Sequence, residues 1–142
     1  MLKKIYYIPQ LTQIFIQLWI MQFWLKSAGY PKVIQKLREK GQGTASFKSY
    51  REQVLRLQKR KLCPTSCLTQ ALVIFWACKS EEDLTLKLGV SKACSKSPSD
   101  GHQKNMDDSK AILAHAWIEK NGLVVWGKLE QRFQVIYTEE TL

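Results

Sequence analysis

Acidic residues are scarce in the first part of this 142-residue chain. Residues 1–61 contain 13 lysines and arginines against two acids, Glu39 and Glu52, which gives a net charge of +11. Residues 62–142 contain 9 basic and 10 acidic residues, so their net charge is −1. Such an excess favours an anionic partner for the first part of the chain, either an acidic peptide, a membrane surface or nucleic acid.

The signals that usually accompany nucleic-acid binding are missing. The chain has no zinc-finger spacing, no glycine-rich phosphate loop and no RNA-binding aromatic signature. No internal repeat is evident. We therefore expect no nucleic-acid partner, which leaves an acidic peptide or a membrane surface.

Cysteine pairs with the Cys-x-x-Cys spacing are also absent. The four cysteines stand at positions 63, 67, 78 and 94. They allow a disulfide scaffold, and a zinc site using Cys94, His102 and His115 beside Cys63 and Cys67 is a weaker alternative. No small-x-small cleavage site follows the apolar N-terminal run. We therefore expect reduced thiols, a cytoplasmic location, and neither metal nor cofactor.

The N-terminal run from Ile5 to Leu25 is long enough to cross a bilayer but is interrupted. Pro9 breaks its apolar character, and Gln10, Gln13 and Gln17 form a polar stripe at helical spacing. We expect a packed or partner-facing helix, with attachment to a membrane surface through residues 5–25 as the alternative and a spanning segment or signal peptide as the weakest reading. The aromatic residues of this run are expected to serve packing rather than a cofactor (Trp19, Phe23 and Trp24).

The rest of the sequence predicts helices followed by strands. At 45% hydrophobic residues, the chain can bury one core and form one main domain. We divide it into a basic, apolar helical segment, 1–45, and a main domain, 46–142. A helix is expected from Phe47 to Arg60 and another from Cys67, followed by strand-like runs (Leu84–Val90, Ala111–Glu119, Leu123–Trp126 and Phe133–Tyr137). This order predicts an α+β fold with an antiparallel sheet.

Cys67 stands where the second of these helices begins. Pro64 cannot continue an earlier helix, and either Thr65 or Ser66 can cap the next one. Apolar residues then recur at the spacing of one buried helical face (Leu68, Ala71, Leu72, Phe75 and Trp76). In a first turn, unpaired N–H groups and the helix dipole favour an anion such as a thiolate, and could later hold an oxyanion.

His115 lies in an apolar run expected to be a strand. A thiol becomes a nucleophile when a helix N-terminus, an imidazole or both stabilise its thiolate. Taken singly, Cys67 can equally well be a buried structural cysteine, and a lone histidine such as His115 on an apolar strand is more often a core residue. Together, a cysteine at a helix start and a histidine from a later strand indicate a nucleophile and its base.

The sequence segments around both residues resemble those of a known family. Cys67-Leu68-Thr69-Gln70-Ala71-Leu72, Leu86-Lys87-Leu88-Gly89-Val90, Ala114-His115-Ala116-Trp117-Ile118-Glu119 and Asn121-Gly122-Leu123-Val124-Val125 are similar to blocks of the lasso-peptide leader peptidases. These microcin-processing proteins belong to the transglutaminase-like thiol peptidases. The resemblance covers roughly residues 50–137.

The resemblance implies a transglutaminase-like or papain-like α+β fold with the nucleophile at a helix N-terminus. Cys67 would be the nucleophile and His115 the base of a peptidase that removes the leader from a ribosomally made precursor peptide. It implies the precursor leader and a small leader-recognition protein as partners, with a ring-closing cyclase acting afterwards. Two rivals stay open: an inactive homologue that only binds the precursor or maturation complex, and a thiol acyltransferase of the same fold group.

The group that orients the histidine is not evident from the sequence. If Asn121-Gly122 forms a type I′ turn, Lys120 pairs with Leu123 and regular pairing places Lys128 opposite His115. Gly127 then offers no side chain. Glu130 would be a diagonal neighbour of His115, so we predict Glu130 as the third catalytic residue. Asn121, Glu119 and the acidic loop remain as alternatives.

Three further segments carry weaker expectations. Ser95–Lys110 is polar and non-periodic, which indicates a loop, either a tolerated surface insertion or a substrate lid. Lys79–Asp83 places three acids after the helix from Cys67, against the preference of its dipole. The basic run Arg56–Lys61 is expected to be a solvated helix end, with leader binding as the alternative.

Overall fold

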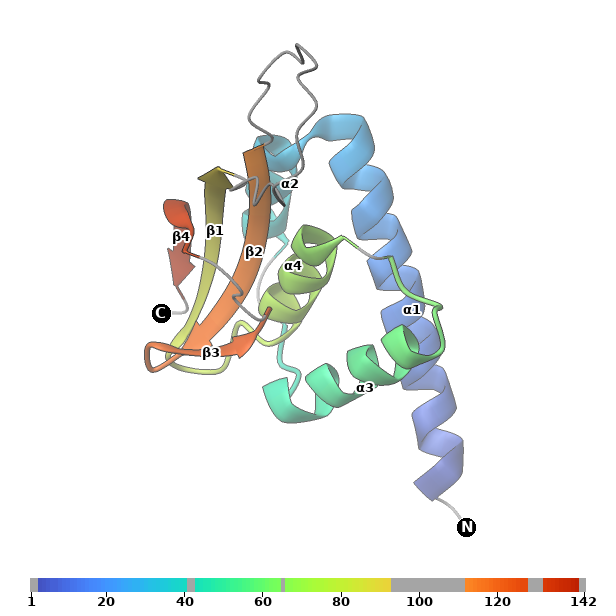
Figure 1. Cartoon of the computed structure of the whole chain (residues 1–142). Coiled ribbons are helices and arrows are strands. Elements are labelled where there is room, and N and C mark those ends of the chain that lie inside the picture. The colour runs from blue at the N-terminus through green and yellow to red at the C-terminus, as the bar shows by residue number, and fades with distance from the viewer. Residues whose placement is uncertain (1–2, 41–42, 65, 93–111, 128–131, 141–142) are drawn as a thin grey trace, which may run out of the picture.

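The computed structural model describes residues 3–40, 43–64, 66–92, 112–127 and 132–140. Within these ranges the chain forms four helices and then a four-stranded antiparallel sheet, which confirms the α+β prediction (Figure 1). The helices are α1 (Lys3–Ala28), α2 (Tyr30–Glu39), α3 (Phe47–Lys59) and α4 (Cys67–Ala77). The strands are β1 (Leu84–Lys92), β2 (Ile112–Lys120), β3 (Leu123–Trp126) and β4 (Gln134–Glu140).

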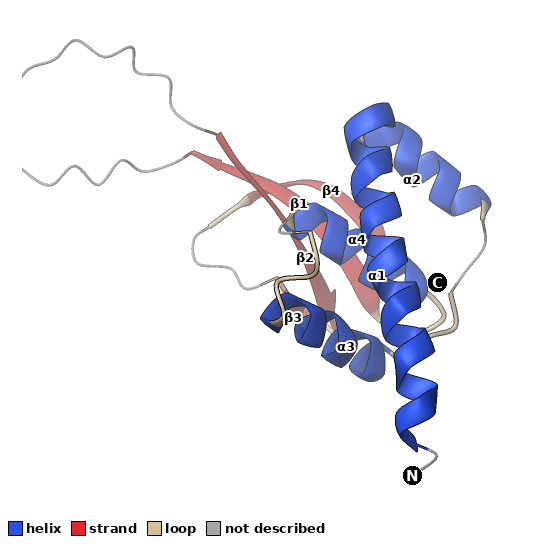
Figure 2. Ribbon diagram, turned by 90° about the vertical axis from the view of Figure 1, so that its right-hand side faces the viewer, coloured by secondary structure: helices blue, strands red, loops and turns tan. Residues whose placement is uncertain are grey.

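Helix α4 lies between the sheet and α1 (Figures 1 and 2). Its sequence is apolar on all sides, and every residue from Thr69 to Trp76 is buried. A helix with this composition needs cover around its whole circumference. One side of α4 therefore packs on β1 and β2 and the other on α1 and α3. The first residue of α4, Cys67, stays half-exposed at the edge of this packing.

Helix α1 is packed against the protein, as the sequence predicted. Its buried residues Ile14, Leu18 and Met21 belong to the same hydrophobic core as α4 and the sheet. Two glutamines face inward and find partners: Gln17 accepts a 2.6 Å hydrogen bond from the Tyr50 hydroxyl, and Gln22 accepts one from Thr69. Within the described ranges, no helix combines the length and apolar character needed to cross a bilayer.

The sheet order is β3-β2-β1-β4. The turn between β2 and β3 has positive φ at Asn121 (51°) and Gly122 (77°), and Lys120 pairs with Leu123, which confirms the type I′ hairpin. The register then shifts between Glu119 and Ile118, so that Ile118 pairs with Trp126. The prediction that placed Lys128 opposite His115 assumed regular pairing along the whole hairpin. That assumption is wrong, because the bulge shifts the pairing by one residue and β3 ends at Trp126.

The sequence suggested an unfavourable charge at the C-terminus of α4, but Glu81, one of the three acids there, has partners elsewhere. The Glu81 carboxylate accepts a 2.6 Å hydrogen bond from the Phe47 N–H at the start of α3 and pairs with Lys120 at 2.9 Å. It therefore lies at a helix N-terminus, where the dipole favours an anion. The C-terminal carbonyls of α4 are met instead by the N–H groups of Gly43 and Ala45, at 3.1 and 2.9 Å.

Candidate active site

Cys67 is the first residue of α4, as predicted. The preceding Ser66 has extended backbone angles, and its hydroxyl accepts a 3.4 Å hydrogen bond from the Thr69 N–H, so Ser66 is the N-cap. The first backbone hydrogen bond of the helix runs from the Gln70 N–H to the Ser66 carbonyl. The N–H groups of Cys67 and Leu68 precede this bond and have no carbonyl partner within the helix.

Gln70 holds the turn before Cys67 in place. Its side chain is buried, and its amide nitrogen donates to the Pro64 carbonyl at 2.6 Å and contacts the Cys63 sulfur at 3.6 Å. Its amide oxygen accepts a 2.6 Å hydrogen bond from Gln58 of α3. Gln70 therefore ties α3, the Cys63-Pro64 turn and the start of α4 together. The sequence did not reveal this role, because a glutamine in a helix gives no sign of burial.

His115 comes from β2, and its ring is held by aromatic neighbours. It stacks on Phe133 with ring centroids 5.2 Å apart and on Trp117 with centroids 6.2 Å apart. Gly89 is paired with His115 on the neighbouring strand β1. A Cβ at Gly89 would lie 2.9 Å from the Trp117 ring and 2.8 Å from the Phe133 Cβ. The absence of a side chain at Gly89 therefore makes room for this aromatic cluster.

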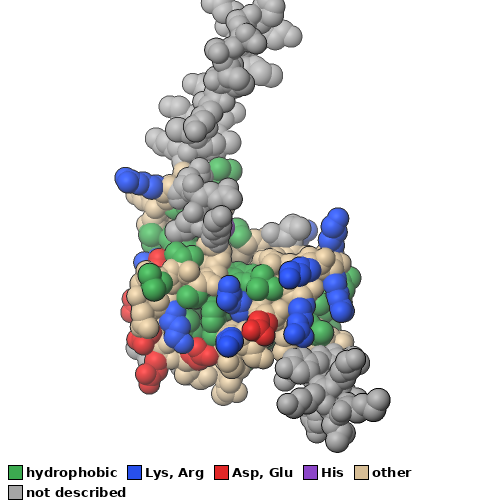
Figure 3. All heavy atoms as spheres, turned by 60° about the horizontal axis from the view of Figure 1, so that its bottom comes forward, with side chains coloured by type: hydrophobic (Ala, Val, Ile, Leu, Met, Phe, Trp, Pro, Cys, Tyr) green, Lys and Arg blue, Asp and Glu red, His purple; other side chains and the backbone are tan. Residues whose placement is uncertain are grey.

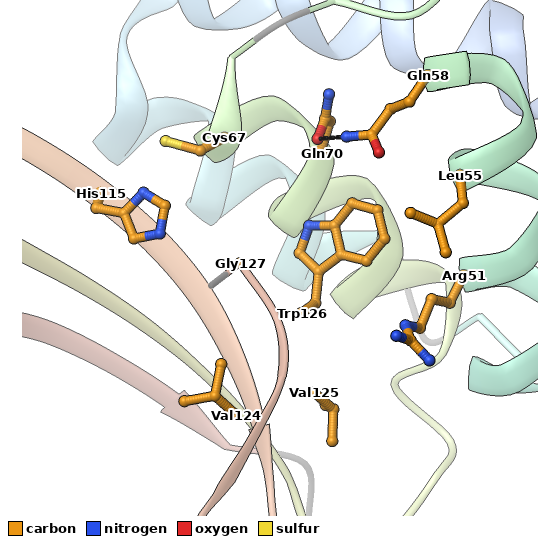
Figure 4. A pocket seen from close by; sticks show the side chains of 10 residues that line it. All are labelled: Arg51, Leu55, Gln58, Cys67, Gln70, His115, Val124, Val125, Trp126 and Gly127. Atoms are coloured by element: carbon orange, nitrogen blue, oxygen red, sulfur yellow. Dashed lines mark hydrogen bonds between the residues drawn. The ribbon is translucent and has the colours of Figure 1, made fainter. Parts of the chain in front are cut away.

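Cys67 and His115 line the same pocket, of about 690 Å³. Both side chains lie at the same end of it (Figure 4), and no hydrogen bond joins them. The ring nitrogen next to Cγ, Nδ1, lies on the Cys67 side, and Nε2 lies on the opposite side. The structure thus brings together the two residues that the sequence predicted as nucleophile and base.

The remaining walls of the pocket come from α3, α4 and β3. They are mainly apolar or amide side chains, with one charged group, Arg51, at the end away from Cys67 (Figure 4). Basic residues are common on the molecule's surface, and Figure 3 shows Lys and Arg side chains among hydrophobic ones over one whole face. The lining residues besides Cys67 and His115 are Arg51, Leu55, Gln58, Gln70, Val124, Val125, Trp126 and Gly127.

Gly127 is a site residue whose role the sequence did not give. Its φ is 78°, and a Cβ there would lie 2.7 Å from the Ala116 carbonyl oxygen and 3.0 Å from the Trp117 Cα. A side chain would be strained by the backbone and blocked by β2. Only glycine therefore lets the chain pass so close to β2 beside His115.

The third catalytic residue predicted from the sequence, Glu130, lies outside the described residues, as do Lys128 and the 95–110 loop. The two described alternatives are not brought to His115. Glu119 is engaged by Lys87 and Trp117, each at 2.8 Å, and Asn121 sits exposed in the hairpin turn. The Nε2 atom of His115 is buried and has no partner among the described residues.

Three thiols are described, and all are free: Cys63, Cys67 and Cys78. Burial raises the pKa of Cys63. Burial, helped by the nearby Glu81 charge, raises the pKa of Cys78 to about 12. Both therefore stay protonated at neutral pH. In the described part of the chain, no three His, Cys, Asp or Glu side chains gather as metal ligands would; Cys94 and His102 lie outside it.

No protein-family model, curated protein or solved structure matches this chain.

Proposed function

We propose that the protein is a cysteine peptidase of the transglutaminase-like class, with Cys67 as nucleophile and His115 as general base. The observation that carries this proposal is the shared pocket, one end of which is lined by a cysteine at a capped helix N-terminus and an imidazole from β2. A helix N-terminus and a nearby imidazole are the two features that activate a cysteine nucleophile in thiol enzymes. The other two described cysteines lack this combination, since neither lines the pocket.

In the proposed reaction, the Cys67 sulfur attacks the carbonyl carbon of a peptide bond while His115 takes up the thiol proton. The oxyanion is held by the N–H groups at the start of α4, which have no carbonyl partner within the helix. His115 then donates its proton to the leaving amine, which leaves a thioester on Cys67. Water, deprotonated by His115, hydrolyses the thioester and regenerates the free thiol.

The substrate we propose is the leader of a ribosomally made precursor peptide, removed during lasso-peptide maturation. The blocks around Cys67 and His115 resemble leader peptidases, and a small leader-recognition protein is the partner that this resemblance implies. The long pocket with apolar walls suits an extended segment of peptide. Arg51 is its one charged lining residue, so an acidic side chain on the substrate would be attracted to that end.

The test is mass spectrometry of a candidate precursor incubated with the protein and its leader-recognition partner. We expect one cleavage at the junction of leader and core, abolished in Cys67→Ala and strongly reduced in His115→Ala. Cys63→Ala is the matched control and should retain cleavage, because its sulfur does not line the pocket. Cleavage that persists in Cys67→Ala would reject the proposed nucleophile.

Two rival functions give other results in the same assay. An inactive homologue that only binds the precursor would retain it in a pull-down without cleaving it. The observation in favour of this rival is that the Nε2 atom of His115 has no orienting partner among the described residues. A thiol acyltransferase would form the thioester on Cys67 but pass the acyl group to an amine. Adding an amine and searching for an amide product instead of the free acid separates this reaction from hydrolysis.

A further inference from the structure

A second surface, which includes no residue that lines the Cys67 pocket, is built from α1. Ile16, Trp19, Ile20 and Phe23 are 48, 50, 44 and 68% exposed, and their spacing places them on one side of the helix. We call these four residues the outer face of α1. The opposite side of the helix carries the buried residues of the core. Monomeric proteins rarely expose a continuous apolar stripe without a binding partner for it.

The outer face adjoins a pocket between α1, α2 and α4. This pocket has a volume of about 290 Å³, and Ile20 belongs both to its lining and to the outer face. It shares no lining residue with the Cys67 pocket. Its walls are mostly apolar, so it suits a single inserted apolar side chain. They consist of Gln17, Ile20, Met21, Trp24, Leu37, Lys40, Val73, Trp76 and Ala77.

The rim of this pocket is positively charged. The ammonium groups of Lys36 and Lys40 lie over the same Trp24 ring, at 4.3 and 4.5 Å from its centroid. Neither forms a salt bridge within the described residues. Two like charges held over one ring repel each other, and a carboxylate between them would remove that cost. The Trp76 indole N–H in the pocket wall is buried and lacks an acceptor among the described residues.

We propose that the outer face of α1 and this pocket bind an acidic amphipathic helix of a second protein. Apolar side chains of that helix would cover Ile16, Ile20 and Phe23, with one inserted into the pocket. Its carboxylates would pair with Lys36 and Lys40. A second copy of this chain bound through the same face fits poorly, because it would bring its own Lys36 and Lys40 to the same place.

A helical partner also fits better than a lipid surface. A pocket of defined size takes an inserted side chain, and the exposed ridge of α1 presents grooves of the kind into which another helix packs. This proposal does not depend on the proposed peptidase activity, because none of its residues contacts the Cys67 pocket.

The test uses two fluorescent peptides of about six helical turns. Both carry leucine at positions i, i+3 and i+4; one has glutamate at its flanking positions and the other lysine. By fluorescence anisotropy in about 150 mM salt, we expect the full-length protein to bind the glutamate peptide. The double variant K36E/K40E should lose about tenfold or more of this affinity and gain affinity for the lysine peptide.

Two further variants sharpen the result. K48E/K59E makes the same charge change on exposed positions of α3 and should leave binding of the glutamate peptide within about twofold of wild type. Phe23→Ser removes an exposed side chain, so it should weaken binding while circular dichroism stays unchanged. The proposal is overturned if both peptides bind equally, or if K36E/K40E behaves like K48E/K59E. Binding only to vesicles of phosphatidylcholine and phosphatidylglycerol, and to neither peptide, would overturn it in favour of a membrane surface.

Discussion

The three described thiols have different surroundings. Cys78 is fully buried in the core, Cys63 is bound to the Gln70 amide, and only Cys67 opens into the pocket. We therefore predict that iodoacetamide at about neutral pH modifies Cys67 first and Cys78 last, because the raised pKa of Cys78 leaves almost no thiolate. Peptide mapping by mass spectrometry after brief exposure measures the three rates separately.

The same experiment tests the part played by His115. In His115→Ala, Cys67 should react more slowly, because no imidazole is left to take up its proton, while the rates of Cys63 and Cys78 stay unchanged. If Cys67 reacted no faster than Cys63 in the wild-type protein, the proposed pairing with His115 would be wrong.

The aromatic cluster around His115 requires a glycine opposite it. An alanine at Gly89 would collide with the Trp117 ring and the Phe133 side chain that stack on the imidazole. We predict that Gly89→Ala lowers the free energy of unfolding by about 1–3 kcal/mol and reduces kcat of leader cleavage more than it changes KM. Urea unfolding and steady-state kinetics measure the two effects. Thr85→Ala, on the same face of β1, is the control expected to change neither strongly.

At the scale of elements, Glu81 joins the start of α3 to the end of β2. Burial alone would raise the pKa of its carboxyl, but hydrogen bonds from Lys120 and the Phe47 N–H outweigh burial and lower that pKa. The folded state therefore binds this proton less readily than the unfolded state. Its contribution to stability is complete above the usual glutamate pKa of about 4.3 and is lost as the pH falls through the lowered value.

Glu81→Gln should consequently destabilise the protein by about 1 kcal/mol at neutral pH. The difference from wild type should shrink as the pH falls below about 4. Urea unfolding at both pH values measures it, with the exposed neighbour Glu82→Gln as control. A difference that persists undiminished in acid would mean that the shape of the side chain matters and its charge does not.

Several elements could be predicted because their signals are local. The hairpin between β2 and β3 follows from Asn121-Gly122, and the start of α4 follows from Pro64 and Ser66. Helix α2 was not predicted, although Pro31 suits the first turn of a helix, because basic residues obscure its short apolar face. The polar end of β4 was also missed. Glu139 there is paired with Arg38 of α2 at 2.5 Å, a contact between residues far apart in the chain.

The candidate site was predictable only in part, because some of its features depend on contacts between residues far apart in the chain. Helix capping and strand pattern placed Cys67 and His115 on their elements, and the two together with their flanking sequences suggested a catalytic pair. The structure adds that they share a pocket. The bulge at Ile118 could not be predicted, and it invalidated the regular pairing used to look for a third residue. The burial of Gln70 and the close approach of Gly127 to Ala116 also depend on tertiary packing, so the local sequence could not predict them.

At the scale of the whole molecule, the N-terminal helices share one core with α4. Six buried apolar residues come from α1 and α2: Ile14, Leu18, Met21, Val33, Ile34 and Leu37. Each such side chain contributes about 1.5–3 kcal/mol on burial, against a net stability of about 5–15 kcal/mol for a typical domain. Removal of α1 and α2 would expose the core residues that they cover, and Thr69 of α4 would lose its hydrogen-bond acceptor, Gln22.

We therefore predict that residues 46–142 do not fold alone, even though they contain both Cys67 and His115. The isolated fragment should show no cooperative unfolding transition by circular dichroism and no selective alkylation of Cys67. Adding a peptide of residues 1–45 should restore both properties, because the uncovered face of α4 regains its partner. A cooperative transition in the fragment by itself would show that α1 and α2 are dispensable for the core. Cys67 would then owe its position at the start of α4 to Ser66 and Gln70 alone.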